Sequence, residues 1–366
     1  MTDKYYIMHF TKIVHLLWVA WLTVSCNHVS RREGIDAEVK KYELKASARQ
    51  ELFMSNGKMA ATDSFLVVGS FLQSDVCRVY AMYDNMKEYL YGKIGNGPHE
   101  YIQPLLTYGY GNEFALNDVN QQMLSVVEVA SNGTSPEFKE KKRLKAPYKR
   151  KKGELVPFDY YFVRLDDGHY VSLVGVKTGS FFTLSDSTLS PVCRFGESPI
   201  EPSMEEELSV ISARNRLNGK IVAHDGCMVY AANYLPYLAC YEKHGDAMEK
   251  KWSFYYATTR YGVRNDDLLF DKETAIGPML DVKMDARYIY LLYMDRLYSE
   301  YDSFDSEKSC SDKVVVFDYE GNRVATLHLD FRIKELAVCS KTLRLYGIAQ
   351  QPDMSLVTFD LPEELY

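Results

Sequence analysis

The feature that most constrains this fold is a four-strand pattern that the sequence repeats. The pattern is clearest over residues 284–329, where MDARYIYLLY leads through a polar loop into KVVVFDYEGNRVATLHLD. β-Branched and aromatic residues predict strands over residues 288–293, 314–318 and 324–329, and EGN at residues 320–322 predicts a tight hairpin turn. One such sheet cannot bury both of its faces by itself, so we expect further copies elsewhere in the chain.

Similar runs of short alternating strands recur along the chain, and each begins near a turn residue. Alignment of these turns gives Asp63, Asp118, Asp167, Asp225, Asp285 and Ser340, which are roughly 50 to 60 residues apart. Alternation with a period of two excludes helical repeats, and four short strands per repeat are typical of β-propeller blades. The last repeat has only three strands, while residues 38–44 (EVKKYEL) form a strand with no local partner. The sequence therefore predicts an all-β, six-bladed β-propeller over residues 37–366, with four antiparallel strands per blade and the ring closed by this N-terminal strand.

Upstream of the repeats the sequence predicts an export signal. Residues 13–24 (IVHLLWVAWLTV) are largely apolar, follow Lys12 and precede Ser25 and Cys26. A helix of this length rises only about 18 Å, too short to span a bilayer, so a signal peptide is favoured; a buried amphipathic helix is the alternative. The small residue before Cys26 resembles the lipobox of bacterial lipoproteins, in which that cysteine is acylated. The resemblance implies a signal peptide over residues 1–25 and a tether over 26–36. It also implies a protein held at the outer membrane by its lipid, facing the periplasm or the outside.

A second resemblance lies between the first two repeats. Residues 91–101 (YGKIGNGPHEY) resemble the G-x-G-P-x-E-[FY] signature of TolB-like six-bladed propeller lipoproteins of Bacteroidetes, and VVVFDYEGNRV is similar to NHL-type repeats. The matching residues are Gly95, Gly97, Pro98, Glu100 and Tyr101; His99 stands where that family usually has glycine. The resemblance implies a propeller on a lipid tether, usually without an assigned activity. We interpret the motif as a turn between blades rather than a phosphate loop, because no helix follows the glycines.

The chemistry-bearing residues do not form a known catalytic signature. The sequence lacks the G-x-S-x-G, H-E-x-x-H and P-loop patterns, and its net charge of −7 argues against nucleic acid as a partner. His169 and His224 lie beside acids, in DDGHY and AHDG. Such acids could surround a central calcium ion, as in lactonase-like propellers, although Asp-Gly turns explain them without a metal; no other cofactor is predicted. Cys227 and Cys240 flank one predicted hairpin and could come close enough for a disulfide.

Two kinds of residue are candidates for binding. Residues 139–152 hold nine basic residues and one acid, and the basic run ends in Lys149, Arg150, Lys151 and Lys152. Among 29 tyrosines, Tyr234 and Tyr256 fall at turns or strand ends, where rings can stack on sugars or anchor a protein. The alternative for the basic run is a solvated loop, and the alternative for the tyrosines is packing within the strands. We therefore expect an envelope-anchored, non-catalytic binding module for a protein partner or a glycan, which contacts the membrane only through its lipid. The alternative is a calcium-dependent lactonase-like hydrolase or lyase with its site in the central channel.

Overall fold

The computed structural model describes residues 27–29, 39–52, 58–70, 74–131, 135–146, 162–173, 180–303, 305 and 307–366. Four of its sheets are four-stranded antiparallel units in which consecutive strands are neighbours. The first contains β4 (Met59–Ala61), β5 (Phe65–Gly69), β6 (Asp75–Ala81) and β7 (Lys87–Lys93). The second contains β8 (Pro104–Tyr110), β9 (Glu113–Asp118), β10 (Met123–Ser131) and β11 (Pro136–Lys145). The third contains β12 (Phe162–Arg164), β13 (Tyr170–Leu173), β14 (Phe182–Ser185) and β15 (Pro191–Phe195). The fourth contains β16 (Gly219–His224), β17 (Cys227–Ala232), β18 (Tyr237–His244) and β19 (Ala247–Tyr255).

The rest of the ring is one larger sheet that contains two such units joined through a long strand. Its strands are, in order, β22 (Met279–Met284), β23 (Ile289–Tyr293), β24 (Ser311–Phe317), β25 (Arg323–Cys339), β26 (Arg344–Ala349), β27 (Ser355–Asp360) and β3 (Ala46–Glu51), with β2 (Lys40–Leu44) added beside β25. The first half of β25 pairs mainly with β24, and the second half pairs with β26. The strand is therefore the last strand of one unit and the first strand of the next.

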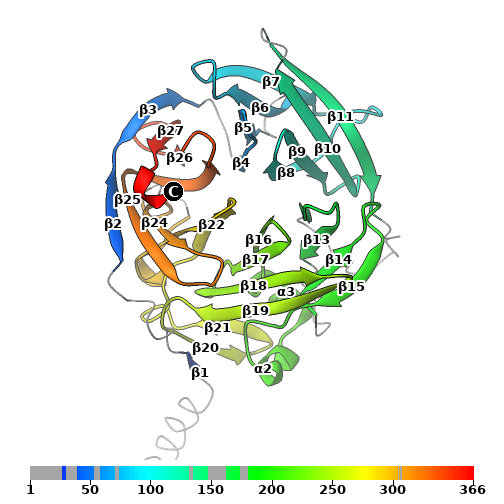
Figure 1. Cartoon of the computed structure of the whole chain (residues 1–366). Coiled ribbons are helices and arrows are strands. Elements are labelled where there is room, and N and C mark those ends of the chain that lie inside the picture. The colour runs from blue at the N-terminus through cyan, green and yellow to red at the C-terminus, as the bar shows by residue number, and fades with distance from the viewer. Residues whose placement is uncertain are drawn as a thin grey trace, which may run out of the picture.

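These units stand around a central axis, as Figure 1 shows. The first strand of each unit contacts the first strand of the next, in the order β4, β8, β12, β16, β22, β25 and back to β4. A cavity of about 70 Å³ lies among residues of all these strands, which include Ala60, Val163, Val222 and Ala337. Radial four-stranded sheets around an axial channel define a β-propeller, so the prediction of an all-β propeller is confirmed.

The strand beside β27 is not the one expected from the sequence. The expectation was residues 38–44, but β2 (Lys40–Leu44) lies parallel to the first half of β25 instead. β27 pairs antiparallel with β26 on one side and with β3 on the other, and β3 begins six residues after the start of β2. The sequence of β3, ASARQE, has little apolar alternation because an outermost strand is largely exposed and needs no second buried face. The polar sequence of β3 therefore does not distinguish it from a loop.

One of the aligned turn residues also has a different place. Asp63, Asp167, Asp225, Asp285 and Ser340 lie in the first hairpin of their units, whereas Asp118 ends β9 and begins the next turn. Its carboxylate accepts the N–H groups of Asn120 (3.1 Å) and Gln121 (3.0 Å) and, from the preceding connection, of Ile102 (2.6 Å). The equivalent first hairpin contains Gly111 with φ of +54°. The spacing was therefore misaligned by one hairpin in this unit.

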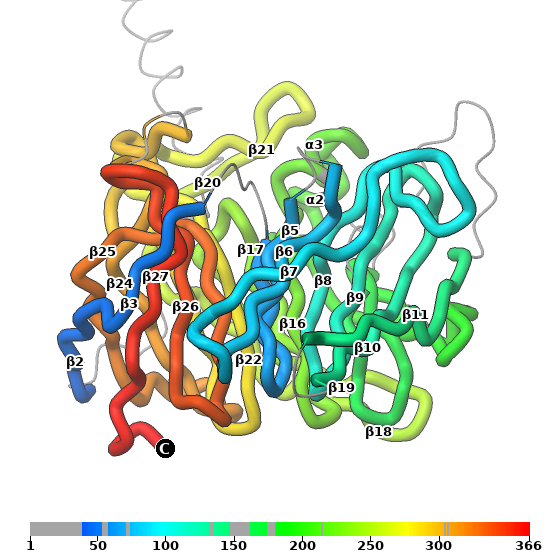
Figure 2. Tube along the Cα trace, turned by 90° about the horizontal axis from the view of Figure 1, so that it is seen from above, coloured from blue at the N-terminus to red at the C-terminus, as the bar shows by residue number. Residues whose placement is uncertain are grey.

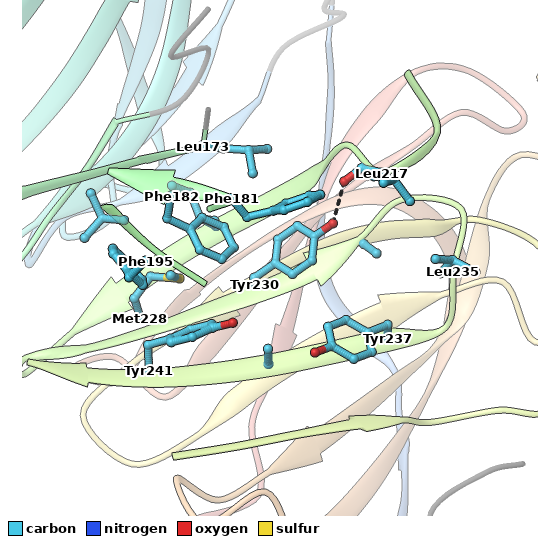
Figure 3. Packing of buried hydrophobic residues seen from close by; sticks show 14 of the residues in the cluster. Leu173, Phe181, Phe182, Phe195, Leu217, Met228, Tyr230, Leu235, Tyr237 and Tyr241 are labelled. Carbon is cyan, nitrogen blue, oxygen red and sulfur yellow. Dashed lines mark hydrogen bonds between the residues drawn. The ribbon is translucent and has the colours of Figure 1, made fainter. Parts of the chain in front are cut away.

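Buried aromatic side chains fill the space between neighbouring sheets. Figure 3 shows the cluster between the third and fourth units, where Phe182 meets the edge of Tyr230 with ring centroids 5.3 Å apart. Further along the ring, Tyr290 and Tyr293 are also buried, as expected for packing residues of a blade strand. The cysteines in the described ranges are free, Cys227 and Cys240 among them. Within the same ranges, none of the helices has the length and apolarity needed to cross a bilayer.

Candidate ligand-binding site

The two ends of the propeller differ in the length of their connections. In an antiparallel unit, the link between the second and third strands lies at the same end as the link to the next unit. The described long segments, 196–218, 256–278 and 294–310, are all links of these two kinds, whereas the other end has short hairpin turns. The long segments form α2 (Pro202–Glu207), α3 (Val210–Arg216), β20 (Thr259–Arg264), β21 (Asp267–Phe270) and the 3₁₀ turn η1 (Tyr298–Glu300). We call these elements the cap; α2, α3, β20 and β21 lie together above the ring in Figure 2.

Hydrogen bonds between separate connections hold the cap together. The Ser209 N–H donates to the carbonyl of Asp266 at 2.9 Å, and joins the start of α3 to the β20–β21 turn. The Tyr298 N–H donates to the carbonyl of Ala275 at 2.8 Å, and joins η1 to the segment after β21. The cap is therefore one structure built from three parts of the sequence.

The base of α3 is fixed on the fourth sheet. The hydroxyl of Tyr230 donates to the carbonyl of Leu217 at 2.6 Å, as the dashed line in Figure 3 shows. Leu217 is buried, and β16 starts two residues later at Gly219. A Cβ on Gly219 would lie 2.3 Å from both the Ala231 carbonyl oxygen and the Tyr230 ring. Glycine is needed there because the backbone of β17 and the Tyr230 ring occupy the space that a side chain would take.

The cap and the adjoining end of the fourth sheet form a pocket of about 670 Å³ that is open to solvent. Its walls come from α3, the β20–β21 turn and the link after β17. The polar lining includes the side chains of Asn215, Asn218, Asn233 and Asn265, together with Arg216 and Tyr234. Each asparagine amide offers both a hydrogen-bond donor and an acceptor, so the pocket suits a ligand with many polar groups.

An ion pair forms one wall of this pocket. Arg216 Nε lies 3.1 Å from Asp267 Oδ1, and Arg216 Nη2 lies 2.9 Å from Oδ2. The Ser212 hydroxyl also donates to Oδ1, at 2.5 Å. The hydrogen bonds from Arg216 and Ser212 lower the pKa of Asp267, and the same carboxylate raises the pKa of Arg216. Both groups therefore stay charged, and the bidentate contact fixes the plane of the guanidinium.

Of the two candidate tyrosines, only Tyr234 belongs to the pocket. Its ring is half-buried and stacks on Phe270 at 6.3 Å between centroids, with Tyr298 edge-on at 6.4 Å. Tyr256 is 4% exposed and packs edge-on against Tyr293 at 5.3 Å. Tyr256 is therefore a core residue, because it belongs to the apolar cluster between the fourth sheet and the unit that begins with β22. Its place at the end of a strand gave no sign of that burial.

The glycine-rich motif is a self-contained turn between β7 and β8. The Glu100 carboxylate accepts the N–H of Gly97 at 2.7 Å, and the Gly95 N–H donates to the Tyr101 carbonyl at 2.8 Å. A Cβ on Gly95 would lie 2.1 Å from Glu100 Oε2, and one on Gly97 would lie 2.9 Å from it. Pro98 lies in the bend between the two halves, and Tyr101 is buried. The glycines thus make room for the glutamate carboxylate.

Part of the basic run is a strand rather than a loop. Residues 139–145 belong to β11, the outermost strand of the second sheet, where exposed lysines disfavour pairing with another chain. Lys149, Arg150, Lys151 and Lys152 lie outside the described residues, and so does Cys26. Three consecutive glutamates end α2: Glu205 is buried, while Glu206 and Glu207 are exposed.

The two histidines named from the sequence do not meet. His169 Nδ1 lies 3.0 Å from Asp167 in the first hairpin of the third sheet, and Lys243 lies 2.7 Å from the other oxygen of that carboxylate. His224 packs against the ring of Tyr110, with centroids 5.8 Å apart. Across the described part of the chain, no group of three or more histidine, cysteine, aspartate or glutamate residues is placed to hold a metal ion. The channel alternative therefore gains no support from these residues.

Charged side chains near the axis are instead paired with one another. Asp281 on β22 lies 2.8 Å from the ammonium group of Lys220 and 3.1 Å from that of Lys283. Glu335 on β25 lies 3.3 Å from Lys220 and 2.7 Å from Lys58, the residue before β4. This axial network joins first strands from opposite ends of the chain.

Comparison with known proteins does not place the chain in a family. No family model matches it, and no curated protein is significantly similar in sequence. Among solved structures, BamB from Moraxella catarrhalis has a TM-score of 0.39 and 11% identity, covering 92% of this chain and 98% of that chain. The β-propeller domain of Cps50 (Swd1) from Myceliophteria thermophila has 0.39 and 9%, covering 82% of each chain. Raptor from Chaetomium thermophilum has 0.45 and 10%, covering 91% of this chain and 30% of that chain. These similarities are too weak for an inference about function, and the resemblance to TolB-like lipoproteins stays a prediction.

Proposed function

We propose that this chain is an envelope-anchored, non-catalytic binding module whose ligand is a glycan held in the cap pocket. The observation that supports it is the pocket, where asparagine amides, an oriented ion pair and one tyrosine ring converge. A volume of about 670 Å³ lies within the usual range of ligand pockets, roughly 300–1,000 Å³. The strands of the cap belong to a sheet separate from those of the ring, so the cap is additional to the propeller scaffold.

A glycan fits the lining better than an apolar ligand or a flat protein surface. Sugar hydroxyls both donate and accept hydrogen bonds, and side-chain amides match them in both roles. The face of Tyr234 can pack against the C–H groups of a sugar ring. Phe270 and Tyr298 contact the Tyr234 ring and hold it in place. Arg216, already oriented by Asp267, has further N–H donors for a hydroxyl or carboxylate of the ligand.

The scaffold in this proposal is a six-bladed propeller over residues 37–366. Six first strands contact one another in a closed cycle, which supports that number of blades. The pairing of β3 with β27 supports closure of the last blade by an N-terminal strand. Cys26, acylated after removal of residues 1–25, is the proposed outer-membrane anchor. The lipobox-like residues and the TolB-like turn motif support this location at the outer membrane.

The test is glycan binding by the full-length chain in detergent. An array of envelope glycans identifies the ligand, and titration gives its Kd for the wild type, Tyr234→Ala and Asn215→Ala. Loss of one ligand hydrogen bond or of ring packing should weaken binding about tenfold, equivalent to about 1.4 kcal/mol. Tyr83→Ala is the matched control, because Tyr83 is 54% exposed in a hairpin at the opposite end. Equal affinities in all four proteins, or no glycan bound, would refute the proposal.

A further inference from the structure

The N-terminal strand joins the same end of the propeller as the pocket. β1 (Asn27–Val29) pairs antiparallel with β20, with Asn27 opposite Tyr261 and Val29 opposite Thr259. Figure 1 shows β1 beside β20, on the outer side of the ring. Because the pairing is antiparallel, the amino end of β1 points along β20 toward the β20–β21 turn. The chain therefore enters the described structure at the cap, beside β20.

The apolar segment of the sequence ends immediately before that entry point. Residues 13–24 are largely apolar, and only two residues separate them from Asn27. Two residues of extended chain span about 7 Å at most. Anything that fixes this part of the chain to a bilayer, whether an acyl group on Cys26 or the apolar run itself, therefore lies close to the cap.

Exposed apolar side chains lie on the two elements next to the β20–β21 turn, α3 and β21. Val210 and Ile211 begin α3, which is joined to the β20–β21 turn through Ser209 and Asp266. They are 38% and 61% exposed, and Leu269 on β21 is 44% exposed. Ile211 is the most exposed of the large apolar side chains in the described ranges. Beside them, β20 carries the exposed cations Arg260 and Arg264, which can meet lipid phosphates.

We propose that the cap is the face of the propeller that rests on the membrane, with Val210, Ile211 and Leu269 in contact with lipid. The occupant of this apolar surface is the bilayer that anchors the chain. Apolar side chains of such a surface enter the boundary between head groups and acyl chains, to a depth of about 5–10 Å. Ile211 also belongs to the rim of the pocket, so the glycan is met at the membrane surface. This inference rests on the anchoring part of the proposed function.

Photocrosslinking to lipid tests this orientation with the full-length chain. Benzoylphenylalanine is introduced by the substitutions Ile211→benzoylphenylalanine and Leu269→benzoylphenylalanine, and each protein is reconstituted into vesicles of phosphatidylethanolamine and phosphatidylglycerol. The same replacement of Tyr83 or Leu90, 54% and 51% exposed, provides matched controls at the opposite end and on an outer strand. After flotation and irradiation, we expect lipid adducts at positions 211 and 269 and none at 83 and 90.

The outcomes separate this inference from the proposed function. Flotation with equal adducts at all four positions, or with none at 211 and 269, overturns the orientation and leaves the anchor in place. A chain that does not float with the vesicles overturns both the anchor and the orientation. Glycan binding is measured on the same preparations. An unaltered Kd in Tyr234→Ala, with adducts still confined to 211 and 269, refutes the pocket while supporting the membrane face.

Discussion

Removal of one buried charge, Asp281→Asn, should destabilise the whole ring. The carboxylate is 1% exposed and accepts hydrogen bonds from Lys220 and from the backbone N–H groups of Val282 and Leu336, the last two both at 3.0 Å. Asparagine keeps the shape, but its single oxygen can accept from only one of these two backbone N–H groups, which bind different carboxylate oxygens. It also leaves the ammonium group of Lys220 without its closest counter-charge. Breaking a buried pair costs about 3–5 kcal/mol. We expect the lower end, about 3 kcal/mol, because Glu335 still lies 3.3 Å from Lys220.

A double-mutant cycle measured by thermal unfolding checks this reasoning. For a chain of this size, about 3 kcal/mol corresponds to a fall in Tm of about 5 °C. In a Lys220→Met background the same substitution should cost only about 1 kcal/mol, because the more buried cation is gone and only Lys283, whose side chain is 20% exposed, loses its partner. Glu320→Gln, which breaks the exposed pair with Lys251, is the control and should change stability by less than about 0.5 kcal/mol. Equal costs of Asp281→Asn in both backgrounds would refute the argument.

The same carboxylate predicts a pH dependence. Burial alone would raise the pKa of Asp281, but the ammonium groups of Lys220, Lys283 and Lys58 outweigh it and hold the pKa below its usual value. A lowered pKa in the folded state contributes stability above the unfolded value, near pH 4, and that stability is lost as pH falls further. The difference in unfolding free energy between wild type and Asp281→Asn should therefore be constant at pH 5–7 and shrink below about pH 4. A difference that grows on acidification would contradict this assignment.

Three further predictions concern the turn motif, ring closure and the basic run. Gly95→Ala should cost about 1–3 kcal/mol by forcing the Glu100 carboxylate aside, and should cost clearly less in a Glu100→Ala background when both are measured by denaturant unfolding. Replacing β3 (Ala46–Glu51) by a glycine-serine linker of equal length should expose the edge of β27 and yield aggregated protein in size-exclusion chromatography, whereas the same replacement of β2 (Lys40–Leu44) should leave soluble protein. Reversal of residues 149–152 to glutamate should leave the Tm unchanged and slow capture of an anionic partner at low salt; unaltered capture would assign the run to solvation.

Much of the architecture could be predicted because strand alternation and turn chemistry are local. The runs around Tyr288 and Val314 predict strands by composition alone, and Asp-Gly pairs predict hairpins by their backbone conformation. The errors occur where a residue type permits two places in the same unit. Asp118 caps a turn as the other aspartates do, but one hairpin later. Exposed outer strands such as β3 lack the run of apolar residues that marks inner strands such as β23.

By itself the sequence determined the repeating unit, the all-β class and the turn at residues 91–101, since each depends on neighbours along the chain. Tertiary structure alone decided which strand pairs with β27, because that choice depends on how far the ring extends before its ends meet. It also decided which of the two candidate tyrosines is accessible to a ligand. Tyr234 is half-exposed in a pocket and Tyr256 is buried, although both follow strands in the same repeat. The pocket combines residues from 209–218, 233–234 and 265–267. No local pattern links these segments, because they meet only when the connections of successive blades fold over one end of the propeller.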